Sequence, residues 1–147
     1  MNLLAQRVLS SSLYIEKKKI VSINRGILAL VGFEKDDTSS DCELIADKLL
    51  NYRIFPDDRG RMENSVLDIK GDLLLVPEVT LALQTMKGSR PSFSEAASFD
   101  LGKNLFDELS IKIRKIHGKL EVGTFGADME INLINQKMNF HTKMRKN

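Results

Sequence analysis

Two short runs of consecutive apolar residues constrain the fold of this chain more than any other feature of its sequence. Residues 27–31 read Ile-Leu-Ala-Leu-Val, and residues 73–76 read Leu-Leu-Leu-Val. Successive side chains of a strand point to opposite faces of a sheet, so a run that is apolar at every position predicts a strand buried on both faces. The chain must therefore supply other elements to cover the two faces.

Alternating patterns predict further strands around these two runs. Apolar and polar residues alternate over residues 3–9 and 129–134, and a charged run at residues 16–19 is typical of a hairpin tip. Residues 79–81 are expected to resume the strand that Pro77 interrupts. Residues 138–144 have a poor strand pattern.

Two helices are expected between the strands. The first is marked by the capping-box spacing of Ser40 and Glu43 and the second by a start near Ser98 or Asp100. Their apolar stripes, at helical spacing, consist of Cys42, Ile45, Ala46, Leu49 and Tyr52 in the first and Leu105, Leu109, Ile113 and Ile116 in the second. The order of elements predicts one α/β domain over residues 1–147, with mixed, largely antiparallel β-sheets in a barrel-like arrangement and two main helices.

Composition excludes several classes of enzyme. The chain has one cysteine, which allows no intramolecular disulfide, and its cysteine and two histidines form no cluster with the spacing of zinc ligands. No Gly-rich phosphate loop or nucleophile elbow is present, so neither a metal enzyme nor a Ser-His-Asp hydrolase is expected. The start lacks the apolar core of a signal peptide, and we expect a cytoplasmic protein with no membrane contact.

Five segments, in order along the chain, resemble conserved motifs of the D-aminoacyl-tRNA deacylase family. They are residues 6–8, 26–37, 52–64, 90–94 and 123–129, which include the sequences Tyr-Arg-Ile-Phe at 52–55 and Arg-Pro-Ser-Phe-Ser at 90–94. The resemblance implies an enzyme that hydrolyses the ester between a D-amino acid and the terminal ribose of tRNA. It also implies a homodimer with its site near the interface, aminoacyl-tRNA as the partner, and no metal or other cofactor.

The resemblance also suggests which residues form the site. It implies a catalytic position at Thr80, whose alternative interpretation is an ordinary β-branched strand residue. Glu78 stands where the family has glutamine, and it acts either as an unusual catalytic base or as a source of phosphate repulsion. The substrate contacts that the resemblance implies are Arg7, Val79, Phe93, Phe125 and Met129. For Met129, ordinary core packing is an equal interpretation.

Two of the family's motifs are altered in this chain. The strand motif Ser-Gln-Phe-Thr-Leu is replaced by Pro-Glu-Val-Thr-Leu at residues 77–81. The Gly-Pro dipeptide, whose cis peptide excludes L-amino acids in the family, is replaced by Lys137 and Met138. A cis bond before a residue other than proline costs roughly 2.5–4 kcal/mol, so we expect a trans peptide here and expect Arg7 to lose its partner in that motif.

Three functions remain open at this point. The first is D-aminoacyl-tRNA hydrolysis, and the second is a deacylase of relaxed chirality that acts on glycyl or small L-aminoacyl esters. The third is a homologue that binds tRNA without catalysis. Hydrolysis of L- or glycyl esters would identify the second function, and tRNA binding without turnover would identify the third.

Overall fold

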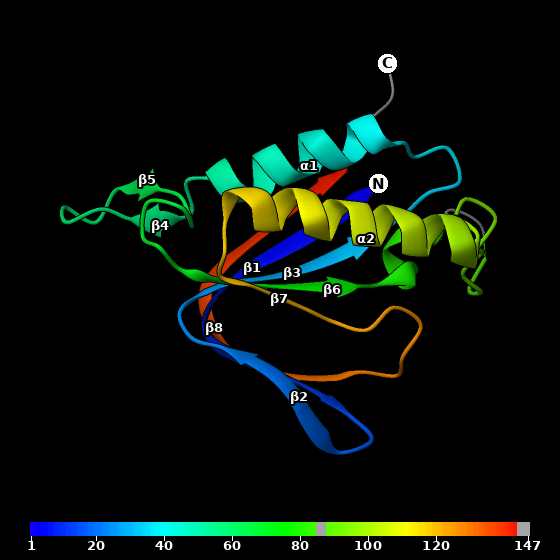
Figure 1. Ribbon diagram of the computed structural model, residues 1–147, viewed down its shortest axis with the longest axis horizontal. Helices are drawn as coiled ribbons and strands as arrows, with labels where there is room; N and C mark the ends of the chain where they lie inside the picture. Colours follow the sequence, from blue (N-terminus) through cyan, green and yellow to red (C-terminus); the bar gives the residue numbers. More distant parts are fainter. Residues whose placement is uncertain (85–87, 144–147) are drawn as a thin grey trace.

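The computed structural model describes residues 1–84 and 88–143, which fold into a mixed α/β structure (Figure 1). The strands are β1 (Asn2–Ile15), β2 (Lys18–Ile23), β3 (Gly26–Gly32), β4 (Phe55–Pro56), β5 (Met62–Asn64), β6 (Asp72–Pro77), β7 (Leu120–Val122) and β8 (Glu130–Lys143). The helices are α1 (Ser39–Asn51), the 3₁₀ helix η1 (Val79–Ala82) and α2 (Phe99–Ile116).

A six-stranded sheet in the order β2-β1-β3-β6-β7, with β8 also paired to β1, forms the centre of the molecule. The pairings of β1 with β2, β3 and β8 are antiparallel, whereas β3, β6 and β7 run parallel. Because β2 packs back toward β6 and β7, the sheet curves into a nearly closed, barrel-like shape (Figure 1). The predicted fold class is confirmed.

Both long helices lie on the same face of this sheet (Figure 1). Leu73 and Leu75 point into the core beneath the helices, and Leu74 and Val76 point into a second core on the inner, concave side. This division confirms that β6 is buried on both faces. The segment that follows the carboxyl end of β6 therefore starts from a strand that is packed on both faces.

The helix ends match the sequence patterns only in part. Helix α1 begins two residues earlier than predicted, since its N-cap is Thr38, which forms the capping box with Asp41, rather than Ser40 with Glu43. Ser98 caps α2 as predicted, through a bond from the Leu101 N–H to its hydroxyl oxygen. Ile116, expected on the core stripe, is the last residue of α2 and is 62% exposed.

One strand prediction was wrong. Residues 79–81 form part of η1, because the Glu78 carboxylate accepts a bond from the Thr80 N–H and thereby caps a helical turn. Strand β8 continues through residue 143 despite its poor pattern, because its backbone pairs with β1 whatever the side chains are. No helix among the described residues is long and apolar enough to cross a membrane.

Candidate active site

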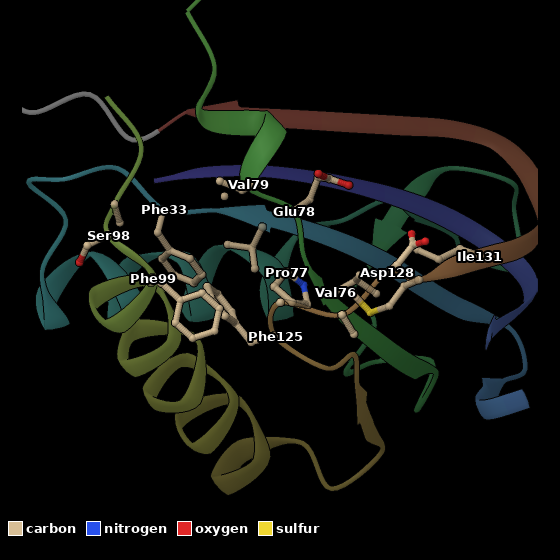
Figure 2. Close-up of a pocket in the computed structure, with 17 residues that line it drawn as sticks. Phe33, Val76, Pro77, Glu78, Val79, Ser98, Phe99, Phe125, Asp128 and Ile131 are labelled. Carbon is tan, nitrogen blue, oxygen red and sulfur yellow. The ribbon is translucent and has the colours of Figure 1, made fainter. Parts of the chain in front are cut away.

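A cavity of about 460 Å³ opens beyond the carboxyl ends of the parallel strands β3 and β6 (Figure 2). The chain leaves β6 at Pro77, and the Glu78 N–H donates to the Val31 carbonyl at 2.7 Å, which fixes the start of the next turn against β3. The N-terminus of α2 and the loop after β7 complete the wall. Ligands in α/β folds commonly bind at this position, where loops leave the ends of parallel strands.

One end of the cavity is aromatic. The rings of Phe99 and Phe125 meet edge to face with centroids 5.2 Å apart, and Phe33 lies beside them (Figure 2). Phe106 supports Phe125 from the core at 6.0 Å. A Cβ atom at Gly102 of α2 would lie 2.9 Å from the Phe125 ring, so glycine at this position lets the ring pack against the helix. The position of the Phe125 ring in the cavity wall is therefore determined by its packing against Phe106 and Gly102.

The middle of the cavity is formed by Pro77 and Met129. Both lie against Gly123, at which a Cβ atom would come within 3.0 Å of the Met129 sulfur and 3.2 Å of Pro77 Cδ. The missing side chain at Gly123 thus allows the loop after β7 to approach the end of β6. Met129 also packs against the inner core, so it lines the cavity and contacts the core at the same time.

The other end of the cavity carries carboxylates. Glu78 and Asp128 both line it, and their carboxylates lie away from the three phenylalanine rings (Figure 2). Glu78 Oε1 accepts bonds from the Thr80 N–H at 3.2 Å and from the Thr80 hydroxyl at 2.6 Å. Thr80 itself is exposed and does not line the cavity.

Arg7 lies outside the cavity and bonds to two backbone carbonyls. Its Nε and Nη2 donate to the Gln136 carbonyl at 3.1 and 2.9 Å, and its Nη1 donates to the Ile54 carbonyl at 2.7 Å. Burial lowers the pKa of its guanidinium, and the positive charge of Arg25 lowers that pKa further. The expectation that Arg7 loses its partner was wrong, because its acceptor is a main-chain oxygen that does not depend on the side chains at 137 and 138.

The backbone beside Gln136 keeps an unusual bend. Lys137 has a φ of 40°, in the left-handed region that favours glycine. No cis peptide bond occurs in the described residues, so the Lys137–Met138 peptide is trans as predicted. Lys137 is exposed and does not line the cavity, and the side chain of Met138 lies outside the described part of the structure.

The structure thus brings together four of the predicted site residues, namely Glu78, Val79, Phe125 and Met129. Thr80 contacts this group through Glu78. Phe93 does not reach the cavity, since it lies in the loop before α2 with 55% of its surface exposed.

Phe33, Phe99 and Asp128 are among the cavity residues that the sequence analysis missed. Phe33 and Phe99 flank predicted elements, and their aromatic character at the end of β3 and the start of α2 was the available signal. Asp128 lies inside a recognised motif, next to Met129, but its negative charge was not considered. Within residues 1–84 and 88–143, no group of three or more His, Cys, Asp or Glu side chains is placed to hold a metal ion.

A barrel-like α/β fold with an aromatic and carboxylate-lined cavity at the ends of its parallel strands defines a small α/β domain with one candidate ligand site. Comparison with known proteins narrows this description. The sequence model of the family described as D-Tyr-tRNA(Tyr) deacylase matches residues 4–137. This chain therefore belongs to the D-Tyr-tRNA(Tyr) deacylase family.

Individual relatives agree with this assignment. A D-aminoacyl-tRNA deacylase of Teredinibacter turnerae is 48% identical over 135 residues, which cover 92% of this chain and 93% of that protein. One from Francisella tularensis is 45% identical over 130 residues, covering 88% and 90%. A solved structure titled c-Myc DNA Unwinding Element Binding Protein superposes with a TM-score of 0.95 at 28% identity, covering 99% of this chain and 100% of that one.

Proposed function

We propose that this chain hydrolyses the ester bond of D-aminoacyl-tRNA, such as D-tyrosyl-tRNA, and so releases free tRNA and the D-amino acid as a proofreading step in translation. The observation that carries the proposal is the family match over residues 4–137, a segment that contains every residue lining the cavity. The cavity is also large enough for part of a nucleotide or an amino acid.

The reaction needs little from the protein. Water attacks the ester carbonyl, a tetrahedral oxyanion forms, the bond from the carbonyl carbon to the ribose oxygen breaks, and that oxygen takes up a proton. An aminoacyl ester is already a reactive acyl donor, so a positioned hydrogen-bond donor at the oxyanion supplies much of the rate. A ribose hydroxyl held beside the ester can assist without a strong protein base.

The first turn of η1 offers the donor. The initial N–H groups of a helix have no partner within the helix. The Thr80 N–H is bound by Glu78, whereas Val79 is the residue of this turn that lines the cavity. We assign the Val79 N–H to the ester oxyanion, and Thr80 to holding Glu78 at the rim. Phe125 and Met129 then form the wall against which the aminoacylated end of the tRNA packs.

A second candidate function, hydrolysis of glycyl or L-aminoacyl esters, is favoured by one observation. The trans peptide between Lys137 and Met138 stands where the family has its chirality-reading Gly-Pro dipeptide. Arg7 nevertheless still holds the backbone at Gln136. On this view the bend survives and chiral discrimination is weakened.

A homodimer is also part of the proposal. Leu9 of β1 and Ile134 of β8 are both exposed on neighbouring strands, where apolar side chains are well suited to burial against a second copy. Light scattering coupled to size exclusion should give twice the mass of one chain. A monomer that is active as a deacylase would overturn this part of the proposal.

The experiment that decides between the functions is hydrolysis of D-tyrosyl-, L-tyrosyl- and glycyl-tRNA by the purified chain. Loss of the D-ester with slower loss of the other two supports the proposal. Comparable loss of the L- or glycyl ester supports relaxed chirality. Hydrolysis of none of them, by a protein that still binds tRNA, contradicts both and leaves a binding role.

A further inference from the structure

The charged run at residues 16–19 forms a tight and exposed hairpin tip between β1 and β2. Ile15 and Lys18 are paired, so the connection is a turn of two residues. These two, Glu16 and Lys17, have φ angles of 49° and 65°, as the type I′ turn of a hairpin requires. The tip also holds the only run of three consecutive basic residues in the chain, namely Lys17, Lys18 and Lys19, and all three are exposed.

The fold does not neutralise the positive charges of this lysine tip. Among the residues that the structure describes, no ion pair involves residues 17–19. Lys19 lies instead over the ring of Tyr14, with its Nζ atom 5.8 Å from the ring centroid. In contrast, Lys35, which follows the aromatic end of the cavity, pairs with Glu95 at 3.1 Å. The lysine tip therefore keeps its charge available for a partner.

Strand pairing brings the lysine tip close to the carboxylate end of the cavity. Leu13 of β1 pairs with Ile131 of β8, and Ile131 lines the cavity near Asp128 (Figure 2). The Leu13 side chain also approaches the loop after β7, since a Cβ atom at Gly123 would lie 3.4 Å from Leu13 Cδ1. Lys17 follows Leu13 by four residues, which span at most about 14 Å of extended chain.

The phosphate backbone of a nucleic acid is the partner that this placement fits. In the proposed substrate the ester is joined to RNA, so phosphates lie just outside the cavity when the ester is inside it. Among the described residues no Lys, Arg or His lines the cavity, and Glu78 and Asp128 add negative charge that repels phosphate. Lysine side chains bind phosphates as point charges and release their counterions. The lysine tip supplies the positive charge that the cavity itself does not.

We infer that the lysine tip binds the phosphate backbone of the tRNA acceptor stem whose 3′ end enters the cavity. This inference rests on the proposed function and names the surface that holds the RNA part of the substrate. Phosphate contacts fix the position of a nucleic acid on a protein without reading its bases. The contact is therefore independent of base sequence and sensitive to salt.

Binding of an RNA minihelix measures this contact without depending on hydrolysis. The probe is an acceptor-stem hairpin with a single-stranded 3′ CCA end, a fluorophore in its loop and no amino acid. Fluorescence anisotropy with the full chain gives the dissociation constant at about 50 mM and about 200 mM salt, a range over which each phosphate contact changes the affinity severalfold.

The test variant is Lys17→Gln combined with Lys18→Gln, which leaves Lys19 in place over Tyr14. We expect its dissociation constant to be about tenfold higher than that of the wild-type chain at about 50 mM salt and nearly equal to it at about 200 mM, because two phosphate contacts contribute roughly two to the slope of log affinity against log salt.

The matched control is Lys48→Gln combined with Lys115→Gln, which removes the same charge from α1 and α2, away from the hairpin (Figure 1). Both lysines are exposed and, among the described residues, neither takes part in an ion pair. The control should therefore bind the minihelix as the wild-type chain does. Since all four substituted side chains are exposed, both variants should melt at the wild-type temperature.

The outcomes separate this inference from the function on which it rests. Equal dissociation constants for the two variants, or an unchanged salt slope in the hairpin variant, overturn the lysine tip as an RNA surface and leave the deacylase proposal standing. A loss of affinity confined to the hairpin variant supports the surface. Lysine-dependent binding by a wild-type chain that hydrolyses none of the three esters supports the surface and overturns the deacylase function.

Discussion

Glu78 accepts two hydrogen bonds from Thr80 through a single carboxylate oxygen, one from the backbone N–H at 3.2 Å and one from the hydroxyl at 2.6 Å. The pair closes the first turn of η1 directly after β6 ends. It also explains why a threonine that does not line the cavity belongs to the site. We propose that Thr80 is a positioning residue for Glu78, which lines the cavity.

Thr80→Ala should therefore weaken substrate binding more than it slows the chemical step. We expect KM for D-tyrosyl-tRNA to rise roughly fivefold with kcat little changed, since the lost hydroxyl bond holds only the orientation of Glu78. Thr80→Ser keeps the hydroxyl and should restore KM. A fall in kcat that serine does not rescue would show that Thr80 acts on the reacting atoms instead.

Arg7 should contribute to the stability of the fold rather than to substrate binding. Arg7→Met removes the donors to the Gln136 and Ile54 carbonyls, and we expect the free energy of unfolding to fall by about 2–4 kcal/mol. Urea denaturation measures the change. A matched variant, Arg53→Met, breaks only an exposed ion pair with Glu63 and should cost less than about 1 kcal/mol. Equal losses in the two variants would contradict this account.

Phe125 links the cavity to the core. Phe125→Ala removes its contacts with Phe99 and Phe106, and we expect a loss of about 2 kcal/mol in unfolding free energy because the ring is only partly buried. The dissociation constant for a stable substrate analogue, 3′-amino-3′-deoxyadenosine joined by an amide to D-tyrosine, should also rise. Phe125→Leu should recover most of the stability. Wild-type ligand affinity in Phe125→Ala would place the binding site elsewhere.

Cys42 should make the protein less stable as the pH rises. Burial raises the pKa of its thiol from 9.0 to about 12, with the charge of Glu108 as a smaller cause. Above pH 9 the unfolded chain loses this proton and the folded chain keeps it, so unfolding becomes more favourable by up to about 1.4 kcal/mol per pH unit.

The comparison that isolates the thiol is urea denaturation of the wild-type chain and Cys42→Ala at pH 8.5 and pH 10. The wild-type chain should lose more stability between the two pH values than the variant does. The native thiol should also resist alkylation at pH 8.5 until the chain is unfolded. Identical pH dependence in the two proteins would refute the assignment.

The parts of the fold that hydrophobic patterning controls were predictable. Leu73 to Val76 are buried on two sides because no polar residue interrupts the run, and Leu105, Leu109 and Ile113 follow the helical period into the core. The start of η1 was not predictable, because it depends on a carboxylate that folds back onto the backbone two residues later. Strand patterns do not contain that information.

The site was predictable only in outline. Motif resemblance placed Glu78, Val79, Phe125 and Met129 together, and the fold brings them to one cavity. The same resemblance suggested Phe93, whose loop carries it away from the cavity. It also suggested that Arg7 would lose its partner. That expectation failed because the partner is the main-chain oxygen of Gln136, and side-chain identity does not determine a bond to a main-chain oxygen.

The measurement that tests the central claim most directly is the rate of D-tyrosyl-tRNA hydrolysis by the wild-type chain and two tryptophan variants. Val79 lines the cavity with 52% of its surface exposed, and Leu44 on α1 is 54% exposed and does not line it. Both sites accept a large side chain without disturbing the core. The two variants differ only in whether the new ring obstructs the cavity.

We predict that the wild-type chain and Leu44→Trp hydrolyse the ester well above the spontaneous rate, and that Val79→Trp is slower by about tenfold or more, because a small misplacement of the ester at the reacting centre costs rates of that order. Equal rates for the two variants would contradict the assignment of the cavity as the active site. A wild-type rate no faster than spontaneous hydrolysis would contradict the deacylase function itself.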